Sequence, residues 1–176
     1  ICPIKIRTKK TFIVTYIGGF GVDHDVNLIL NVAKILKDNG NNEFQFKLVG
    51  GGVNWQKCIK YSKDHGLKNV QFIGPIKKAE VPKMQCQSDI LIAAITDTES
   101  YKFGLNLNKL CGYLASGKPV IFAGSAPNNP IQECGAWFTL KAGDCNGVIQ
   151  SLLTIKQLKT LKKNLGCLVL NYLSLH

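Results

Sequence analysis

The stretch TFIVTYIGGFGVDHDVNLILNVAKILKDNG, residues 11–40, decides the fold. Its first seven residues are rich in β-branched and aromatic side chains and stop at Gly18 and Gly19, which is typical of a buried strand. From Val26 onward, apolar residues recur with helical spacing until Asn39 and Gly40. This pattern indicates an amphipathic helix that ends at a glycine. A strand joined to a helix by a glycine turn is the building unit of an α/β fold.

The same alternation continues along the chain. Strand patterns lie at residues 44–49, 70–73, 90–95, 120–123 and about 137–140, and helical patterns lie at residues 55–65, 80–86, 110–114, 148–153 and 158–165. We therefore expect a Rossmann-like parallel sheet of about six strands with helices on both faces. Ligands of such sheets bind beyond the carboxyl ends of the strands. The glycine-rich stops of the first three strands fall at that edge.

The composition fits one folded domain. The chain has 176 residues, 45% of them hydrophobic, which suffices for one buried core and is short for two domains. No apolar run approaches the roughly 20 residues that cross a bilayer. Because the chain opens at Ile1 without a methionine, we expect a fragment. Residues 1–10 are predicted to be a linker or interdomain segment, residues 11–166 the domain, and residues 167–176 a C-terminal tail.

Seven cysteines make an odd count without any Cys-x-x-Cys spacing. Disulfide frameworks and structural zinc sites show closer pairing. We therefore expect reduced thiols, most of them buried, in a cytoplasmic protein. The three histidines are scattered, and we expect no metal site and no cofactor.

The formal net charge of +11 is compatible with nucleic acid, an anionic membrane surface or a phosphate-rich ligand. Lys57, Lys60 and Lys63 follow one face of a predicted helix, and a solvated surface explains them. Two other clusters are better candidates for contact with anionic lipid head groups at the inner face of a membrane. They comprise Lys5, Arg7, Lys9 and Lys10 near the start and Lys156, Lys159, Lys162 and Lys163 near the end.

The stretch KFGLNLNKLCGYLASGKPV, residues 102–120, carries the most specific pattern. A loop centred on Gly104 leads into a helix with Asn108 at the capping position. Free backbone amides at a helix start, with lysine beside them, suit a phosphate. Lys109 opposes the helix dipole in the first turn, and this unfavourable local choice indicates a role in binding. The stretch resembles the donor-sugar loop of GT-B glycosyltransferases of family 4, the branch that assembles capsule, O-antigen and related surface glycans.

Two further motifs extend the resemblance. Residues 18–24 read GGFGVDH, which lacks the third glycine and the acidic partner of a dinucleotide fingerprint. They resemble the first loop of the family's donor domain, near the diphosphate, where this chain offers backbone amides and His24. Residues 69–74 read NVQFIG, like the family segment that meets the nucleotide base. Plain tight turns remain the alternative at both places.

The resemblance implies a set of donor-binding residues at the carboxyl edge of the sheet. One position departs from the family pattern, because Gly112 stands where relatives carry the carboxylate that binds the ribose hydroxyls. Glu99 is the candidate replacement. Lys109 is predicted to stabilise the leaving group, and no residue is assigned as the catalytic group. The predicted donor-binding set is Gly18, Gly19, Gly74, Pro75, Ile76, Glu99, Gly104, Leu105, Asn108 and Lys109.

We therefore expect the C-terminal, donor-binding half of a glycosyltransferase of the hexosyltransferase type. Such an enzyme moves a sugar from a nucleotide-sugar to a glycan or lipid-linked acceptor, with retention of anomeric configuration. Its partners would be the nucleotide-sugar donor and a missing N-terminal acceptor domain, and we expect no nucleic-acid partner. Because the acceptor domain is missing, the fragment alone would be inactive. Two alternatives stay open: a degenerate nucleotide-binding module without turnover, and half of a nucleotide-sugar epimerase.

Overall fold

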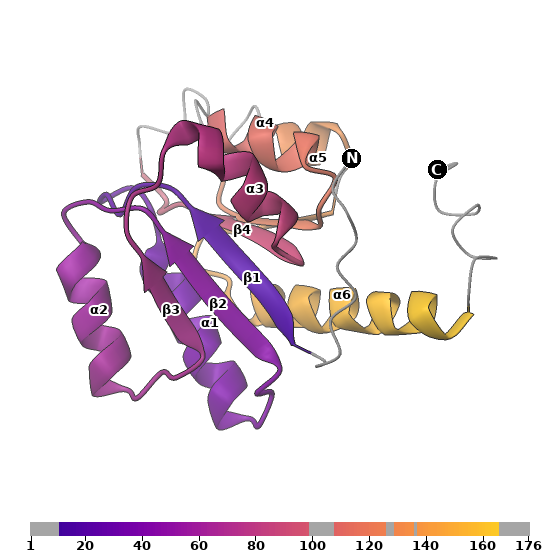
Figure 1. Cartoon of the computed structure of the whole chain (residues 1–176), viewed down its shortest axis with the longest axis horizontal. Helices are drawn as coiled ribbons and strands as arrows, with labels where there is room; N and C mark the ends of the chain where they lie inside the picture. Colours follow the sequence, from indigo (N-terminus) through magenta and orange to yellow (C-terminus); the bar gives the residue numbers. More distant parts are fainter. Residues whose placement is uncertain (1–10, 99–107, 126–128, 136, 166–176) are drawn as a thin grey trace.

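The computed structural model describes residues 11–98, 108–125, 129–135 and 137–165. Its strands are β1 (Phe12–Ile17), β2 (Phe44–Val49), β3 (Val70–Ile73), β4 (Ile90–Ala94), β5 (Val120–Ala123) and β6 (Phe138–Leu140). Its helices are α1 (Val26–Asp38), α2 (Trp55–Asp64), the 3-10 turn η1 (Lys78–Glu80), α3 (Val81–Cys86), α4 (Asn108–Ala115), α5 (Pro130–Glu133) and α6 (Cys145–Leu165). Strands and helices alternate from β1 to α6, as the sequence predicted (Figure 1).

The six strands form one parallel sheet in the order β3-β2-β1-β4-β5-β6. The chain first builds outward from β1 to β3 and then restarts at β4 on the other side of β1. The loops after β1 and β4 therefore diverge at the centre of the carboxyl edge, where open α/β sheets bind ligands. This confirms the predicted α/β class and the Rossmann-like parallel sheet.

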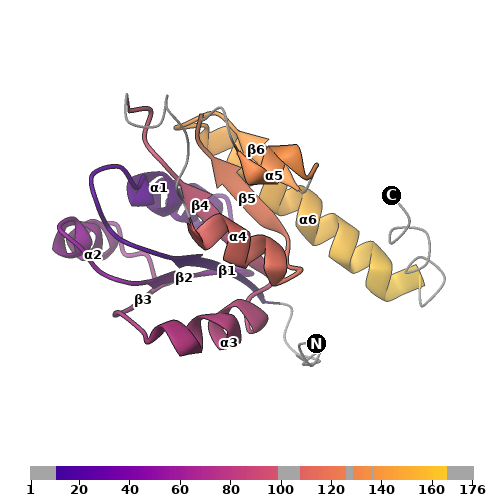
Figure 2. The ribbon, with the colours of Figure 1, turned by 90° about the horizontal axis from the view of Figure 1, so that it is seen from above.

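Helices cover both faces of the sheet (Figure 2). Side chains of α1, α2 and α6 pack into one apolar cluster, and those of α3, α4 and α5 pack into the other. Alternate residues of β1 divide between the two clusters: Val14 and Tyr16 belong to the first and Ile17 to the second. Because both faces are covered, β1, β4 and β5 are buried at every position, and Thr15 is the one polar residue among them.

Two helical predictions need correction. The helices expected at residues 148–153 and 158–165 are one continuous helix, α6, because the residues between them contain no breaker and Ile155 is fully buried. Helix α5 was not predicted, since four residues are too few to show a helical period. It is defined instead by its start, where the Asn129 side chain accepts a hydrogen bond of 3.0 Å from the Ile131 amide and Pro130 opens the first turn.

The lysines follow the predictions in part. Lys57, Lys60 and Lys63 are exposed, as expected. In the C-terminal cluster, Lys156 pairs with Glu43, and the Lys159 Nζ donates to the Asp89 carbonyl at 2.8 Å. These two lysines therefore have partners within the fold. The segments 1–10 and 167–176, predicted as linker and tail, lie outside the described residues.

The cysteines differ from the expectation of buried, reduced thiols. Cys58 is buried, whereas Cys111 and Cys134 are exposed and Cys145 is partly covered. Cys86 takes part in a disulfide bond. Among the described residues, no helix is both long enough and apolar enough to cross a membrane.

The loops after β1 and β2 pack backbone against backbone. A Cβ atom on Gly50 would lie 1.9 Å from the Gly18 carbonyl oxygen, and one on Gly52 would lie 2.8 Å from the Phe20 carbonyl oxygen. Both glycines also have positive φ angles, +133° and +147°, which other residues rarely adopt. Glycine is therefore required at these positions by space as well as by conformation.

We predict that Gly50→Ala lowers the free energy of unfolding by about 2 to 4 kcal/mol, because backbone strain and steric overlap add. Gly40→Ala is the matched control, since Gly40 has a φ of +76° and open space around it. Its cost should be about 1 kcal/mol, from the backbone alone. Urea denaturation of both variants measures the difference, and equal losses would contradict the packing argument.

Candidate functional site

Hydrogen bonds between loops join the carboxyl ends of the first three strands. The Gly18 amide donates to the Val49 carbonyl at 2.9 Å, and the Phe20 amide donates to the Gly51 carbonyl at 2.9 Å. The Gly50 amide donates to the Ile73 carbonyl at 3.0 Å. These bonds hold the first loop against the second and the second against the end of β3. Gly18, Gly19, Gly74 and Pro75 thus lie along one edge, as the alternation of strands and helices predicted.

A cluster of aromatic side chains packs against the first of these loops. The Phe20 ring meets the rings of Tyr16 and Trp55 edge to face, with centroids 5.8 and 4.7 Å apart. The Trp55 ring in turn meets Phe72 edge to face at 5.5 Å. Such pairs add about 0.5 to 1.5 kcal/mol each beyond the burial of their area. The edge therefore rests on a packed layer that spans β1, β3 and α2.

Helix α4 is fixed to the end of β1 by Tyr113. Its buried hydroxyl accepts a hydrogen bond of 2.8 Å from the Ile17 amide and donates one of 3.2 Å to the Ile17 carbonyl. Burial raises the pKa of Tyr113 above its ordinary value, so the hydroxyl stays neutral and keeps its proton for this bond. Leu110 is fully buried beside it. These contacts place the first turn of α4 over the loop after β1.

Lys109 lies in that first turn and reaches back over β1. Its Nζ stands 4.9 Å from the centre of the Tyr16 ring and 3.4 Å from the Tyr16 hydroxyl. A Cβ atom on Gly18 would come within 2.7 Å of this nitrogen, so Gly18 leaves space for the amine. No carboxylate pairs with Lys109 within the part of the chain that the structure describes.

Burial lowers the pKa of Lys109 to about 8. Because the folded-state pKa lies below the unfolded one, the charged amine disfavours the folded state below about pH 8. That penalty disappears as the pH rises through the folded pKa toward the unfolded value. It would also be offset by an anion beside the amine, since a buried charge is costly only while it is unpaired. Lys109 is thus a cation held ready for a negatively charged ligand.

His24 stands on the same side of the sheet edge. It forms an isolated bridge with Ile95, and its ring carbon Cδ2 would lie 3.7 Å from a Cβ atom on Gly19. Its Nδ1 is buried and has no hydrogen-bond partner among the described residues. Burial, and secondly the charge of Lys109, lower the pKa of His24. The sequence pointed to His24 only through its place in the first loop, and His24 was not included in the predicted set.

Four backbone amides of the first loop, those of Gly19, Gly21, Val22 and Asp23, donate to no other group within the described residues. The Gly18 amide, by contrast, donates to the Val49 carbonyl. Free amides beside a partly desolvated lysine and a histidine form a small electropositive surface. In the described ranges, no group of three or more histidine, cysteine, aspartate or glutamate side chains is placed to hold a metal ion.

The other predicted residues are placed only in part. Ile76 packs on the core cluster of α3 and α4, while Gly74 and Pro75 are exposed. Asn108 is the first residue of α4 rather than the residue before it. Glu99, Gly104 and Leu105 lie outside the described residues.

Gly112 lies on α4 facing α3. A Cβ atom there would be 3.4 Å from the Gln85 amide nitrogen, which is ordinary van der Waals contact. A larger side chain at this position would therefore meet the movable end of another side chain and not the backbone.

Comparison with known proteins decides the family. The model for glycosyl transferases of group 1 matches residues 11–157. The chain belongs to this family. The match covers every strand and all but the end of α6, so the whole described fold is that of a group 1 glycosyltransferase. A comparison with curated proteins gives no match.

Solved structures of GT-B glycosyltransferases share the fold of this group 1 chain. A variant of TarM from S. aureus, solved with fondaparinux, alpha-GlcNAc-glycerol and UDP, matches with a TM-score of 0.69 and 15% identity over 88% of this chain. The lipopolysaccharide outer core galactosyltransferase WaaB matches with a TM-score of 0.67 and 17% identity over 90%. HepE from Anabaena, solved with UDP-glucose, matches with a TM-score of 0.66 and 15% identity over 82%. The chain spans 30%, 43% and 38% of the lengths of these proteins.

We predict that Tyr113→Phe lowers the free energy of unfolding by about 1 to 3 kcal/mol, because it leaves the buried Ile17 amide without its acceptor. Tyr61→Phe is the matched control. The Tyr61 hydroxyl donates to Asn31 at an exposed position, where water can replace the bond, and its loss should cost less than about 1 kcal/mol. Thermal or urea denaturation compares the two, and a larger loss in Tyr61→Phe would refute the anchoring role of Tyr113.

Proposed function

We propose that this group 1 glycosyltransferase chain is the donor-binding half of an enzyme that moves a sugar from a nucleotide-sugar to a glycan or lipid-linked acceptor. The observation that carries the proposal is Lys109, a partly buried cation without a carboxylate partner among the described residues, held over Gly18 at the carboxyl edge. A diphosphate would supply the negative charge that is missing beside the Lys109 amine. A neutral ligand would leave the cost of desolvating Lys109 in place.

The donor diphosphate would lie between Lys109 and the first loop. The Gly19 and Gly21 amides offer neutral donors, and His24 offers a ring nitrogen on the same side. When the bond between sugar and phosphate breaks, the departing nucleotide gains negative charge. A fixed cation and fixed dipoles stabilise that charge more than they stabilise the ground state, which lowers the barrier. In this proposal Lys109 stabilises the leaving group.

The nucleoside would extend toward β3. The exposed backbone of Gly74 lets a planar base approach, with Pro75 and Ile76 as the apolar wall. The ribose would then lie near α4, where Gly112 offers no acceptor. Glu99 is the proposed replacement, and Gly104, Leu105 and Asn108 are proposed to meet the sugar and the distal phosphate.

The relatives support this assignment by their ligands. HepE was solved with UDP-glucose and TarM with UDP, so proteins of this fold hold a uridine nucleotide. We extend this to the present chain because it keeps a lysine at the start of α4 and an open glycine loop after β1. By family resemblance we also propose that transfer retains the anomeric configuration. An N-terminal half would supply the acceptor site, so the present chain alone should bind donor and turn over little.

A second candidate is a nucleotide-binding module that has lost turnover. The observation in its favour is Gly112, which removes the carboxylate expected to bind the ribose. Donor binding would then rest on the diphosphate contacts alone. The two candidates differ in whether restoring a carboxylate at residue 112 restores affinity.

We predict that Lys109→Ala weakens the binding of uridine or guanosine diphosphate by about 1 to 3 kcal/mol, the value of a charge-assisted hydrogen bond. Isothermal titration calorimetry measures this loss. Lys118→Ala is the control, because Lys118 precedes β5 and so lies at the opposite, amino edge of the sheet. It should leave affinity unchanged.

In the same titration, Gly112→Glu should strengthen binding by about 1 kcal/mol or more, because it restores a charged acceptor for the ribose. The substitution also favours the helix, since glycine is a poor helix former. Unchanged affinity in both Lys109→Ala and Gly112→Glu would show that the donor site is elsewhere or absent.

A further inference from the structure

Strand β3 forms one edge of the sheet, and helices flank it on both faces. It is last in the strand order, and among the described residues it pairs only with β2. Helix α2 lies beside it on one face, and η1 with α3 lies on the other (Figures 1 and 2). We call the surface formed by α2, the turn to β3, β3, η1 and α3 the β3 edge. The proposed nucleoside wall, residues 74–76, joins β3 to η1 and borders this edge, whereas Lys109 lies on α4.

Exposed charge on the β3 edge is strongly one-sided. The exposed acids are Asp64 and Glu80, and Glu80 is already bonded to the Lys77 amide at 2.9 Å. At the opposite edge, around β6, the exposed charged side chains of the described residues are Glu133 and Lys141, whose charges balance. Within the described chain, none of the exposed lysines of the β3 edge pairs with a carboxylate. These lysines are Lys57, Lys60, Lys63, Lys68, Lys77, Lys78 and Lys83.

An apolar groove lies within this basic surface, between α2 and β3. Its volume is about 330 Å³. Lys63 and Lys68 stand at its rim, one on α2 and the other on the turn that follows. The groove therefore combines an apolar floor with flanking cations. The apolar residues of the lining are Ile59, Leu67, Val70 and Phe72.

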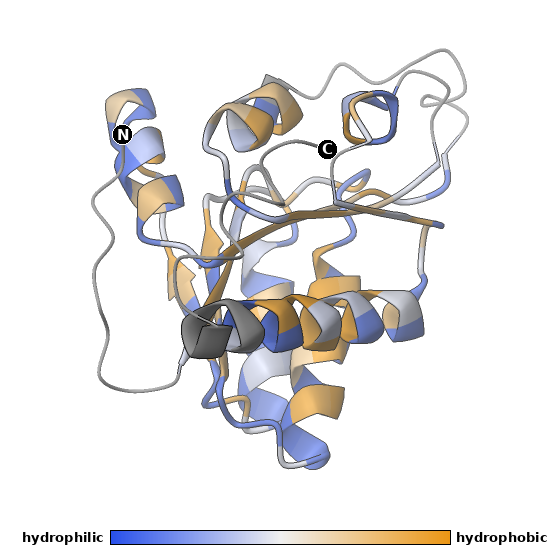
Figure 3. Cartoon of the chain, turned by 90° about the vertical axis from the view of Figure 1, so that its right-hand side faces the viewer, coloured by the Kyte–Doolittle hydropathy of each residue, from blue (hydrophilic) through white to orange (hydrophobic). Residues whose placement is uncertain are grey.

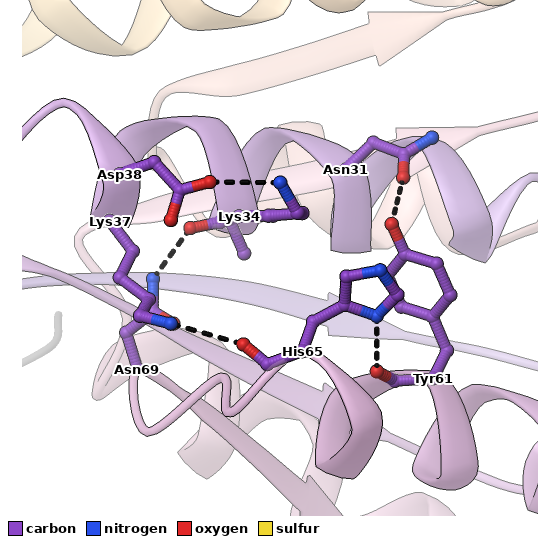
Figure 4. A network of polar contacts seen from close by, with 8 residues as sticks. Asn31, Lys34, Lys37, Asp38, Tyr61, His65 and Asn69 are labelled. Carbon is purple, nitrogen blue, oxygen red and sulfur yellow. Dashed lines mark hydrogen bonds and ion pairs between the residues drawn. The ribbon is translucent and has the colours of Figure 1, made fainter.

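A polar network next to the groove joins the end of α2 and the turn after it to α1 (Figure 4). The Tyr61 hydroxyl donates to Asn31 at 2.7 Å, and the Lys37 amine donates to the His65 carbonyl at 3.0 Å. The buried Asn69 side chain donates to the Ala33 carbonyl at 2.9 Å. These bonds fix both ends of the turn that carries Lys68. The backbone that carries Lys68 is thus held in place before any binding.

We propose that the β3 edge docks on an anionic lipid bilayer. Each lysine near an anionic membrane surface contributes attraction, and an apolar groove can take an acyl chain. A soluble polyanion, such as an acidic peptide, would satisfy the lysines but would leave the groove unfilled. The hydropathy view, which faces the α6 side of the molecule, shows apolar strands beneath helices that carry both apolar and polar turns (Figure 3).

Co-sedimentation with vesicles tests the proposal. The chain should bind vesicles of equal parts phosphatidylcholine and phosphatidylglycerol, and should not bind phosphatidylcholine alone. Binding should weaken with added salt, since salt screens the attraction between the lysines and the lipid head groups. The double variant Lys63→Gln with Lys68→Gln should bind about 25-fold more weakly, or about fivefold for each lysine.

The matched control is Lys118→Gln with Lys141→Gln, which removes the same net charge away from the β3 edge. It should keep most of the binding, and circular dichroism checks that both variants fold. Equal loss in both double variants would overturn the proposal, because total charge would then explain the binding. Equal affinity for soluble polyglutamate would overturn it in favour of an acidic protein partner, and absence of binding to the anionic vesicles would also refute it.

Discussion

The loops after β1 and β2 meet at a distance that only glycine permits, and the candidate site depends on that contact. A side-chain carbon at Gly50 or Gly52 would overlap the backbone of Gly18 or Phe20. Close packing allows the hydrogen bonds that join the two loops, and it fixes the first loop at the sheet edge. Strand β4 lies beside β1 in the sheet, and α4 follows β4 in the chain. Helix α4 therefore begins at the same sheet edge as the first loop.

Helix α4 adds the charged part of this arrangement. Tyr113 fastens the helix to the last residue of β1 through two buried hydrogen bonds. Lys109, one turn earlier, is thereby carried over Tyr16 into a place where it loses water and gains no carboxylate from the described residues. Such a position weakens the folded state unless an anion binds. We interpret this as preorganisation, in which the fold carries the cost of desolvation before the ligand arrives.

Periodicity and glycine stops were sufficient to predict the sheet. The bounds of β2, β3 and β5 agree with the prediction, because each strand is followed directly by a glycine. The split of α6 was wrong because the pattern of buried residues weakens near Thr154 although nothing there breaks a helix. Helix α5 left no periodic signal at all. Its cap at Asn129 is visible only when the chain is folded.

The sequence was enough to single out Lys109 as a binding residue, but not to predict the contacts that position it. Lys109 stood out because its charge opposes the helix dipole, but no local pattern predicted its contact with Tyr16. The bond between Tyr113 and Ile17 joins residues 96 positions apart, which local patterns do not reveal. Glu99, Gly104 and Leu105 lie outside the described residues, and their roles stay predictions.

The most direct test is the pKa of Lys109 in the free and nucleotide-bound chain. Nuclear magnetic resonance of labelled lysine side chains can follow its titration, with Lys109→Ala to assign the signal. The account predicts a pKa of about 8 in the free chain and a clear rise when uridine or guanosine diphosphate is bound, because an anion stabilises the charged amine. A pKa that stays the same with the diphosphate bound at saturation would contradict the account, because the diphosphate would then lie away from Lys109.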